Sequence, residues 1–170
     1  MARQIEIVER DSIPAVQKKA EISMFKLPKF IGGTYKAIFT ELEKVRLKPA
    51  DAPFVRYHGL NWQGLRNENK ILMFIKEMFR KWNLTAGVPV DAELQEFGEF
   101  EVAATPAGKF IQTTHEGSYM KVSKTYCEML DWADSNNVKC KNESMEIYLN
   151  DPREVKQKDL RTIVLIPVAE

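Results

Sequence analysis

An internal repeat constrains this chain more than any other feature of its sequence. Residues 33–38 (GTYKAI) recur with the same spacing as residues 117–122 (GSYMKV), and a Pro-Ala pair precedes each copy, at Pro14 and at Pro106. Two copies of one unit can bury their apolar faces against a shared core, and 170 residues are enough for one such core. We therefore expect one domain, with these approximate limits: 1–170 for the whole, about 5–95 for the first repeat and about 98–170 for the second.

Each repeat shows the same order of patterns, which is a strand, a helix and two further strands. The strand-like runs are rich in alternating or β-branched residues. They are predicted over these residues: 15–22, 54–58 and 88–94 in the first repeat, and 109–114, 145–149 and 162–168 in the second. This duplicated β-α-β-β order predicts an α+β fold with pseudo-two-fold symmetry, in which two antiparallel-rich sheets backed by helices enclose a central ligand cleft.

One amphipathic helix is predicted in each repeat, because apolar residues recur there three and four positions apart. Thr34 and Ser118 are the expected N-caps, since a hydroxyl can accept a hydrogen bond from a free backbone N–H. Pro49 is expected to stop the first helix, and the Asn136–Asn137 pair to end the second. The apolar stripes are Tyr35, Ile38, Phe39, Leu42 and Val45 in the first helix, and Tyr119, Val122, Tyr126, Met129, Leu130 and Ala133 in the second.

A third amphipathic pattern separates the two repeats and predicts an inserted helix over about 67–82. Its apolar stripe is Ile71, Phe74, Ile75, Met78, Phe79 and Trp82. This helix is expected to pack on the core, and the alternatives are a lid over the cleft or a docking face for a partner.

The overall charge balance argues against nucleic acid and membrane partners. Lys plus Arg number 25 against 24 for Asp plus Glu, so the chain has no bulk attraction for phosphate-rich surfaces. No apolar run is long enough to span a bilayer, and no signal peptide is expected. Two cysteines, Cys127 and Cys140, fit a reducing compartment, so we expect a cytoplasmic protein. Because neither end is expected to hold a DNA-binding domain, any regulatory output would pass through a partner protein.

Glu146 is the candidate binding residue with the clearest physical rationale. Strand alternation over 145–149 puts Met145, Ile147 and Leu149 on one face, and Glu146 with Tyr148 on the other. If the aliphatic face meets the helices, Glu146 and Tyr148 line the cleft between the repeats. A carboxylate beside aromatic rings suits a lipophilic cation. The alternative is a solvated glutamate on an exposed sheet face.

Position within the repeat supplies the other candidates for the ligand pocket. Tyr57 is the counterpart of Tyr148, and Val55 stands where Glu146 stands, so the cleft should hold one acid instead of two. The predicted ligand-binding residues are Glu146, Tyr148, Trp62, Tyr57, Tyr119, Tyr35 and Phe39, although an aromatic residue at helical spacing serves the core as readily as a pocket. Tyr148 and Trp62 rank ahead of the helix tyrosines.

Metal, nucleotide and other cofactor sites are not expected. His58 and His115 are the two histidines, and neither has a Cys, Asp or Glu partner at metal-ligand spacing. The sequence contains no G-x-S-x-G segment, Walker loop or dinucleotide-binding fingerprint.

Several segments of the second repeat together resemble the GyrI-like family. They are HEGSY at 115–119, EIYLNDP at 146–152, Arg161-Thr162 and Ile166-Pro167-Val168. This family includes effector-binding domains of AraC-type and MerR-type multidrug regulators and the bacterial gyrase-inhibitory protein. The resemblance implies a small-molecule cleft in which the glutamate of this strand lies among aromatic rings. Helix 67–82 departs from the family pattern, because that region is a shorter loop in many relatives.

Two classes of function remain open at this point. The first is a stand-alone binding module, a sensor or sequestering protein for small, hydrophobic, cationic organic molecules; gyrase modulation through a protein contact is a further family alternative. The second is a hydrolase, since some GyrI-like proteins cleave strained cyclopropanoid electrophiles. Glu146 would then be the catalytic general base, with Trp62 positioning the substrate. Haem binding of the SOUL type, with His58 or His115 as axial ligand, ranks below both.

Overall fold

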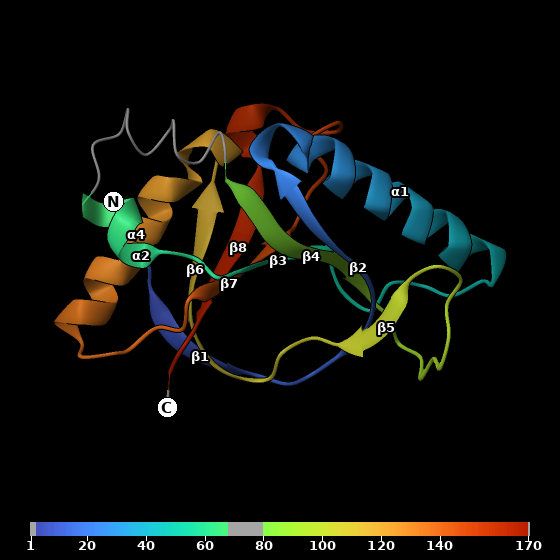
Figure 1. Ribbon diagram of the computed structural model, residues 1–170, viewed down its shortest axis with the longest axis horizontal. Helices are drawn as coiled ribbons and strands as arrows, with labels where there is room; N and C mark the ends of the chain where they lie inside the picture. The colour runs from blue at the N-terminus through green and yellow to red at the C-terminus, as the bar shows by residue number, and fades with distance from the viewer. Residues whose placement is uncertain (1–2, 68–79, 170) are drawn as a thin grey trace.

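The strands of the two repeats join into one continuous sheet. The structure is a computed structural model that describes residues 3–67 and 80–169. In these residues eight antiparallel strands run in the order β1-β6-β8-β7-β3-β4-β2-β5 (Figure 1). The strands are β1 Glu6–Arg10, β2 Pro14–Ser23, β3 Phe54–His58, β4 Lys81–Pro89, β5 Glu101–Ala104, β6 Gly108–Glu116, β7 Glu143–Tyr148 and β8 Arg161–Pro167. The helices are α1 Leu27–Lys44, α2 Trp62–Asn67 and α4 Val122–Ser135. The predicted α+β class is confirmed.

The expectation of two sheets is wrong because the second strands of the two repeats pair with each other. Strand β3 runs antiparallel to β7, with Phe54 opposite Ile147 and Val55 opposite Glu146. This pairing satisfies backbone N–H and C=O groups that two separate sheets would leave at open edges. On either side of the seam the strand order is the same, since the third strand of each repeat lies between its first and second.

Two short strands that the sequence patterns did not predict exchange partners between the repeats. Strand β1 precedes β2 in the chain but pairs with β6, and β5 precedes β6 but pairs with β2. The connections after these strands meet each other. The Thr105 N–H donates to the Ile13 carbonyl at 2.8 Å, and the Ile13 N–H donates to the Thr105 hydroxyl at 3.0 Å. Each repeat therefore completes the outer edge of the other.

Helix α1 begins about two turns before the predicted N-cap. It starts at Leu27 with a proline in its first turn, so Thr34 is a buried helical residue and the N-cap prediction is wrong. Pro28 presets a helical φ, and Gly32 and Gly33 are accommodated inside the helix because glycine there costs only about 1 kcal/mol. The helix ends at Lys44, and Val45, the last residue of the predicted stripe, is exposed.

The second helix agrees better with its sequence signals. The Ser118 hydroxyl accepts a hydrogen bond from the Met120 N–H at 3.3 Å, at the start of a short 3-10 turn that leads into α4. Helix α4 ends at Ser135, followed by Asn136 and by Asn137 in a left-handed conformation (φ 55°). No helix in the described residues is long and apolar enough to cross a membrane.

The boundary between the inserted segment and β4 differs from the prediction. Trp82 lies in β4, which covers residues 81–89 where the sequence suggested 88–94. The apolar residues of β4 alternate, and Trp82 fits both this alternation and the helical stripe that was predicted to contain it. The rest of that stripe, from Ile71 to Phe79, lies outside the described residues. Helix α2, which precedes it, was not predicted.

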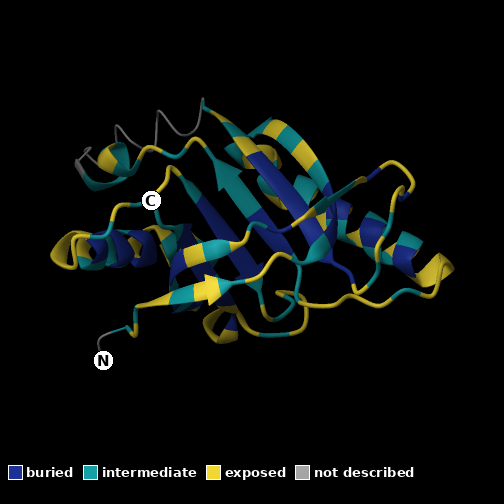
Figure 2. Cartoon of the chain, turned by 90° about the horizontal axis from the view of Figure 1, so that it is seen from below, coloured by how far each residue is buried: buried dark blue, intermediate teal, exposed yellow. Residues whose placement is uncertain are grey.

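The helices of both repeats lie on one face of the sheet. Helix α1 packs against β2 and β4, while α4 packs against β6, with α2 beside it (Figure 1). Buried residues line the central strands and the inner sides of the helices (Figure 2). Beneath α1 the core contains Val16, Ile38, Leu42, Val88 and Val90, and beneath α4 it contains Ile111, Met129, Leu130, Val164 and Ile166.

The strand alternation of β7 holds, but the helices cover the other face from the one expected. Met145 and Ile147 pack on the face without helices, in a cluster with Phe54, Phe110 and Leu165. The crossing connections at Ile13 and Thr105 lie at the ends of strands whose side chains belong to this cluster, so it needs no helix to bury it. Glu146 and Tyr148 accordingly point to the helical side.

A glycine-to-alanine pair tests the packing of this sheet. A Cβ at Gly87 would lie 2.7 Å from the Phe54 ring and 2.9 Å from the Val16 carbonyl oxygen. We expect Gly87→Ala to lower the free energy of unfolding by about 1–3 kcal/mol, as overpacked cores do. Gly32 in α1 has no atom within 4 Å of such a Cβ. Gly32→Ala should therefore raise the free energy of unfolding by up to about 1 kcal/mol. Urea denaturation measures both, and equal effects would contradict the described packing.

Candidate functional site

Glu146 is a buried acid at the centre of the sheet. It lies in β7 beside the seam, and only 5% of the residue is exposed. The Tyr126 hydroxyl donates to its Oε1 at 2.8 Å, and the Tyr148 hydroxyl donates to its Oε2 at 2.9 Å. The Tyr126 hydroxyl also lies 2.9 Å from the Ser144 hydroxyl. The two carboxylate oxygens are thus held by tyrosines from different elements, α4 and β7.

All five tyrosines of the chain gather around this carboxylate. Tyr148 forms edge-to-face contacts with Tyr119 at 5.5 Å and with Tyr35 at 6.5 Å between ring centroids. Two tryptophans extend the aromatic wall. The Trp62 ring lies 5.6 Å from that of Tyr126, and the Trp82 ring lies 5.7 Å from that of Tyr57. The site therefore combines one acid with several groups of packed aromatic rings.

Helix α2 holds Trp62 against Tyr126 through contacts at both of its ends. The Trp62 indole N–H donates to the Lys141 carbonyl oxygen at 2.8 Å. The Arg66 guanidinium bridges to Asp134 at 2.6 Å and to Asp131 at 2.9 Å, and both acids lie on α4. Because Asp131 and Asp134 are largely exposed, these ion pairs fasten α2 without deep burial of charge.

The electrostatics of the site are those of a buried acid held by hydroxyl donors. Burial raises the pKa of Glu146, while the hydrogen bonds from Tyr126 and Tyr148 lower it and offset part of that rise. Burial, and then the charge of Glu146, raise the pKa values of Tyr126 and Tyr119, so both hydroxyls keep their protons at neutral pH. No Lys, Arg or His of residues 3–67 and 80–169 forms an ion pair with Glu146.

The structure brings together six of the seven predicted ligand-binding residues. Glu146, Tyr148, Tyr57, Tyr119 and Tyr35 share one cluster, and Trp62 joins it through Tyr126. The seventh, Phe39, lies in the core cluster beneath α1. Val55, predicted to be the counterpart of Glu146, is its direct register partner across the seam.

Sequence reasoning missed Tyr126 and Trp82. Tyr126 falls on the apolar stripe of its helix, where an aromatic residue is read as core, and its ring is indeed buried. Its hydroxyl could have been suspected, because a buried tyrosine normally needs a hydrogen-bond partner. Trp82 fits the apolar stripe of the predicted inserted helix, so the sequence pattern did not place it on β4.

The histidines are engaged elsewhere in the fold. His115 is buried, with Nδ1 2.7 Å from the Thr125 hydroxyl and Nε2 3.0 Å from the Ser118 carbonyl oxygen. Both of its ring nitrogens are therefore occupied, which argues against an axial haem ligand. His58 Nε2 lies 3.0 Å from the Thr85 hydroxyl. Among the described residues no three His, Cys, Asp or Glu side chains are grouped to hold a metal ion.

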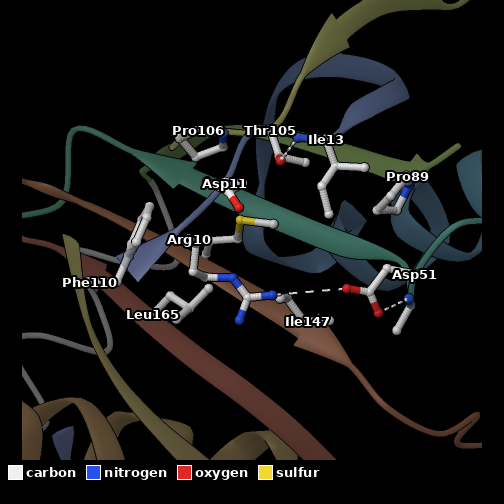
Figure 3. A pocket seen from close by; sticks show the side chains of 12 residues that line it. Arg10, Asp11, Ile13, Asp51, Pro89, Thr105, Pro106, Phe110, Ile147 and Leu165 are labelled. Atoms are coloured by element: carbon white, nitrogen blue, oxygen red, sulfur yellow. Dashed lines mark hydrogen bonds and ion pairs between the residues drawn. The ribbon is translucent and has the colours of Figure 1, made fainter. Parts of the chain in front are cut away.

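A small hollow lies on the opposite face of the sheet, away from this chemistry. Arg10 and Asp51 line it, 3.9 Å apart, above a floor that includes Phe110, Ile147 and Leu165 (Figure 3). None of the predicted ligand-binding residues lines it. Arg10 and Asp51 balance each other's charge, so Glu146 and its tyrosines form the stronger candidate site.

Removing the Tyr126 hydroxyl should destabilise the fold, because the buried Glu146 carboxylate then has one donor fewer. We expect Tyr126→Phe to lower the free energy of unfolding by about 1–3 kcal/mol, because a buried charged acceptor loses its donor. Urea denaturation at pH 7 measures this change. Tyr119→Phe is the matched control, since the Tyr119 ring borders the site but its hydroxyl does not hold the carboxylate, and it should change stability by less than about 0.5 kcal/mol.

The raised pKa of Glu146 also predicts how stability depends on pH. The folded state holds the Glu146 proton more tightly than the unfolded chain does. The free energy of unfolding should therefore fall as the pH rises from the pKa of glutamate in the unfolded chain, about 4.3, to the higher pKa of Glu146 in the folded state. Glu146→Gln should remove this downward component from the pH profile of the free energy of unfolding. The exposed Glu93→Gln should leave the profile unchanged, and identical profiles for both variants would contradict the assignment.

Solved structures with the same fold include the C-terminal domain of EcmrR, a hydrolase and a protein with bound tetraphenylphosphonium. The crystal structure of the EcmrR C-terminal domain has a TM-score of 0.76 at 18% identity, covering 100% of this chain and 99% of that one. A hydrolase encoded by lin2189 from Listeria innocua has a TM-score of 0.67 at 14% identity, covering 98% and 92%. SAV2435 bound to tetraphenylphosphonium has a TM-score of 0.58 at 12% identity, covering 98% and 94%.

At these identities the three structures support the fold alone. Among curated protein sequences none matches this chain. The family model of the GyrI-like small molecule binding domain, in contrast, matches residues 3–169, which is almost the whole chain and includes both repeats and the seam between them. This chain therefore belongs to the GyrI-like small molecule binding domain family.

Proposed function

We propose that this protein binds lipophilic organic cations at Glu146. The observation that carries the proposal is a buried carboxylate, held only by tyrosine hydroxyls among the described residues, inside a wall of aromatic rings. A buried charge costs several kcal/mol unless a counter-charge or hydrogen bonds compensate it. Two hydroxyl donors supply part of this compensation, and a bound cation would supply the rest.

The aromatic lining suits cations whose charge is spread over an apolar surface. Each tyrosine or tryptophan face within reach of a cation contributes about 0.5–2 kcal/mol through its ring quadrupole. Tyr148 brings the rings of Tyr119 and Tyr35 to Glu146, and Tyr126 brings that of Trp62. A small hydrated ion would lose its water shell here without replacement ligands, whereas a phosphonium or quaternary ammonium has no such shell to lose.

The family supports a small-molecule ligand, and one structural relative supports a lipophilic cation. The family is described as small-molecule binding, and SAV2435 was solved with tetraphenylphosphonium, a lipophilic cation. Because Glu146 is nearly fully buried, entry of such a ligand requires side chains around it to move. Trp62 is the natural candidate for this movement, since it sits on the short helix α2 and its anchor Arg66 binds two largely exposed acids.

Tetraphenylphosphonium is the probe for this proposal. We expect isothermal titration calorimetry at pH 7.5 to show one site, and Glu146→Gln to raise its Kd at least about 30-fold, since a desolvated charge pair is lost. Glu93→Gln, an exposed acid far from the rings, is the control and should bind like the parent. Equal affinity for the parent and for Glu146→Gln would exclude Glu146 as the binding acid.

Binding should also weaken as the pH falls. A protonated Glu146 has no charge to offer a cation, so Kd should rise as the pH is lowered through its pKa, which burial places above the ordinary glutamate range. A cation in turn favours the ionised form, so binding releases a proton when Glu146 starts protonated. The Kd of Glu146→Gln should not change over pH 4–8, and a parallel rise in both proteins would point to another titrating group.

A hydrolase acting on strained cyclopropanoid electrophiles is the second candidate function. It is favoured by one observation, since a buried carboxylate with a raised pKa can accept a proton from an attacking water near neutral pH. One structural relative is described as a hydrolase. Chromatographic assay of a cyclopropanoid panel distinguishes the two functions. Turnover that Glu146→Gln abolishes without loss of binding would favour the hydrolase, and stoichiometric binding without turnover would favour the sequestering protein.

A further inference from the structure

Two buried donors among the rings on the α1 side of Glu146 have no hydrogen-bond partner among the described residues. They are the Tyr35 hydroxyl on α1 and the Trp82 indole N–H on β4. Most buried polar groups in folded proteins are paired, and an unpaired donor costs about 1–3 kcal/mol. Such a cost is expected where a ligand supplies the missing partner.

Both donors belong to the aromatic wall around the proposed ligand site. Tyr35 lies edge-on to Tyr148, which holds Glu146, and Trp82 lies edge-on to Tyr57. All four rings pack against one small cluster, made of Val55, Leu84 and Ala86. The unpaired donors therefore share the α1 side of the site, whereas Tyr126 and Trp62 border its α4 side.

The chemistry of the two groups specifies what can satisfy them. An indole N–H can only donate a hydrogen bond. The Tyr35 hydroxyl can donate or accept, but burial and the charges around it raise its pKa, so it keeps its proton and can donate. Two unpaired donors packed against one cluster, in contact with the tyrosines around a carboxylate, call for a ligand with its positive charge near Glu146 and an acceptor atom toward α1.

We infer that the ligand of this site is an organic cation that also carries an uncharged acceptor oxygen, such as a ketone, ester or ether, which receives hydrogen bonds from Tyr35 and Trp82. The inference rests on the proposed function, because it assumes that the cation occupies the Glu146 site. Tyr35 and Trp82 then determine specificity. They distinguish oxygen-bearing cations from hydrocarbon cations of the same size and charge.

A matched pair of synthetic ligands isolates this acceptor. The probes are (4-acetylbenzyl)triphenylphosphonium and (4-isopropylbenzyl)triphenylphosphonium, which share charge and number of heavy atoms and differ in whether the branch carries a carbonyl oxygen or a second methyl group. For the full-length parent we expect calorimetry to show the acetyl ligand binding about 3- to 10-fold tighter, the range expected for one or two neutral hydrogen bonds.

Variants of the two donors test whether they produce this preference. Tyr35→Phe should bring the ratio of the two Kd values toward one by weakening the acetyl ligand alone, and Trp82→Phe should act in the same direction. Trp82→Phe also removes ring area, but this loss affects both ligands alike and so cancels in the ratio of their Kd values. Trp132→Phe is the matched control, since Trp132 packs in the core beneath α4 and not against Val55, Leu84 and Ala86, and it should leave the ratio unchanged.

The free protein gives a second and independent readout. Because the Tyr35 hydroxyl lacks a partner, Tyr35→Phe should leave the melting temperature unchanged or raise it, in contrast to Tyr126→Phe, which should lower it. A melting temperature for Tyr35→Phe as low as that of Tyr126→Phe would overturn the inference, because the hydroxyl would then have a stabilising partner, such as a buried water.

The outcomes distinguish a failure of this inference from a failure of the proposed cation binding. If both phosphonium ligands bind in a Glu146-dependent manner with equal Kd, and Tyr35→Phe changes neither, the acceptor specificity is wrong and cation binding stands. If neither ligand binds, or if Glu146→Gln weakens neither, the proposed function itself fails.

Discussion

The pairing of β3 with β7 is the interaction on which the rest of this structure depends. It turns two β-α-β-β units into one sheet, and it places Val55 and Glu146 opposite each other at the centre. Helix α1 covers one half of the sheet and α4 the other, so the seam between them is where side chains from both repeats meet. For this reason Tyr126 on α4 donates to the carboxylate, while Tyr35 on α1 contacts Tyr148, which also donates to it.

A buried acid in such a position is costly for folding and useful for recognition. Glu146 has a raised pKa because burial outweighs the two tyrosine hydrogen bonds. The same imbalance is the basis of the proposed cation binding, since the folded chain has already desolvated the acid and ordered the rings around it. The hollow on the opposite face lacks this property, because Arg10 and Asp51 already provide both signs of charge there.

Much of this arrangement could be predicted from the sequence, because it depends on local periodicity and on the repeat. The alternation around Glu146 and the correspondence of Tyr57 with Tyr148 are such features. Long-range pairing could not be predicted in the same way. The exchange of β1 and β5 depends on contacts between the connections at Ile13 and Thr105, which leave no local pattern. Which face the helices would cover was also ambiguous, because apolar residues occupy both faces of the central strands.

The register of the seam explains why a chain with two similar halves can hold a single acid at its centre. In a dimer of two identical half-length chains joined at this seam, the positions of Val55 and Glu146 would be one residue facing its own copy. A glutamate there would bring two carboxylates to about 5 Å, a separation at which like charges oppose each other. Covalent fusion removes that restriction, because each half can then change independently. A lone carboxylate facing a valine is thus a form of asymmetry that becomes accessible only after the two halves are encoded in one chain.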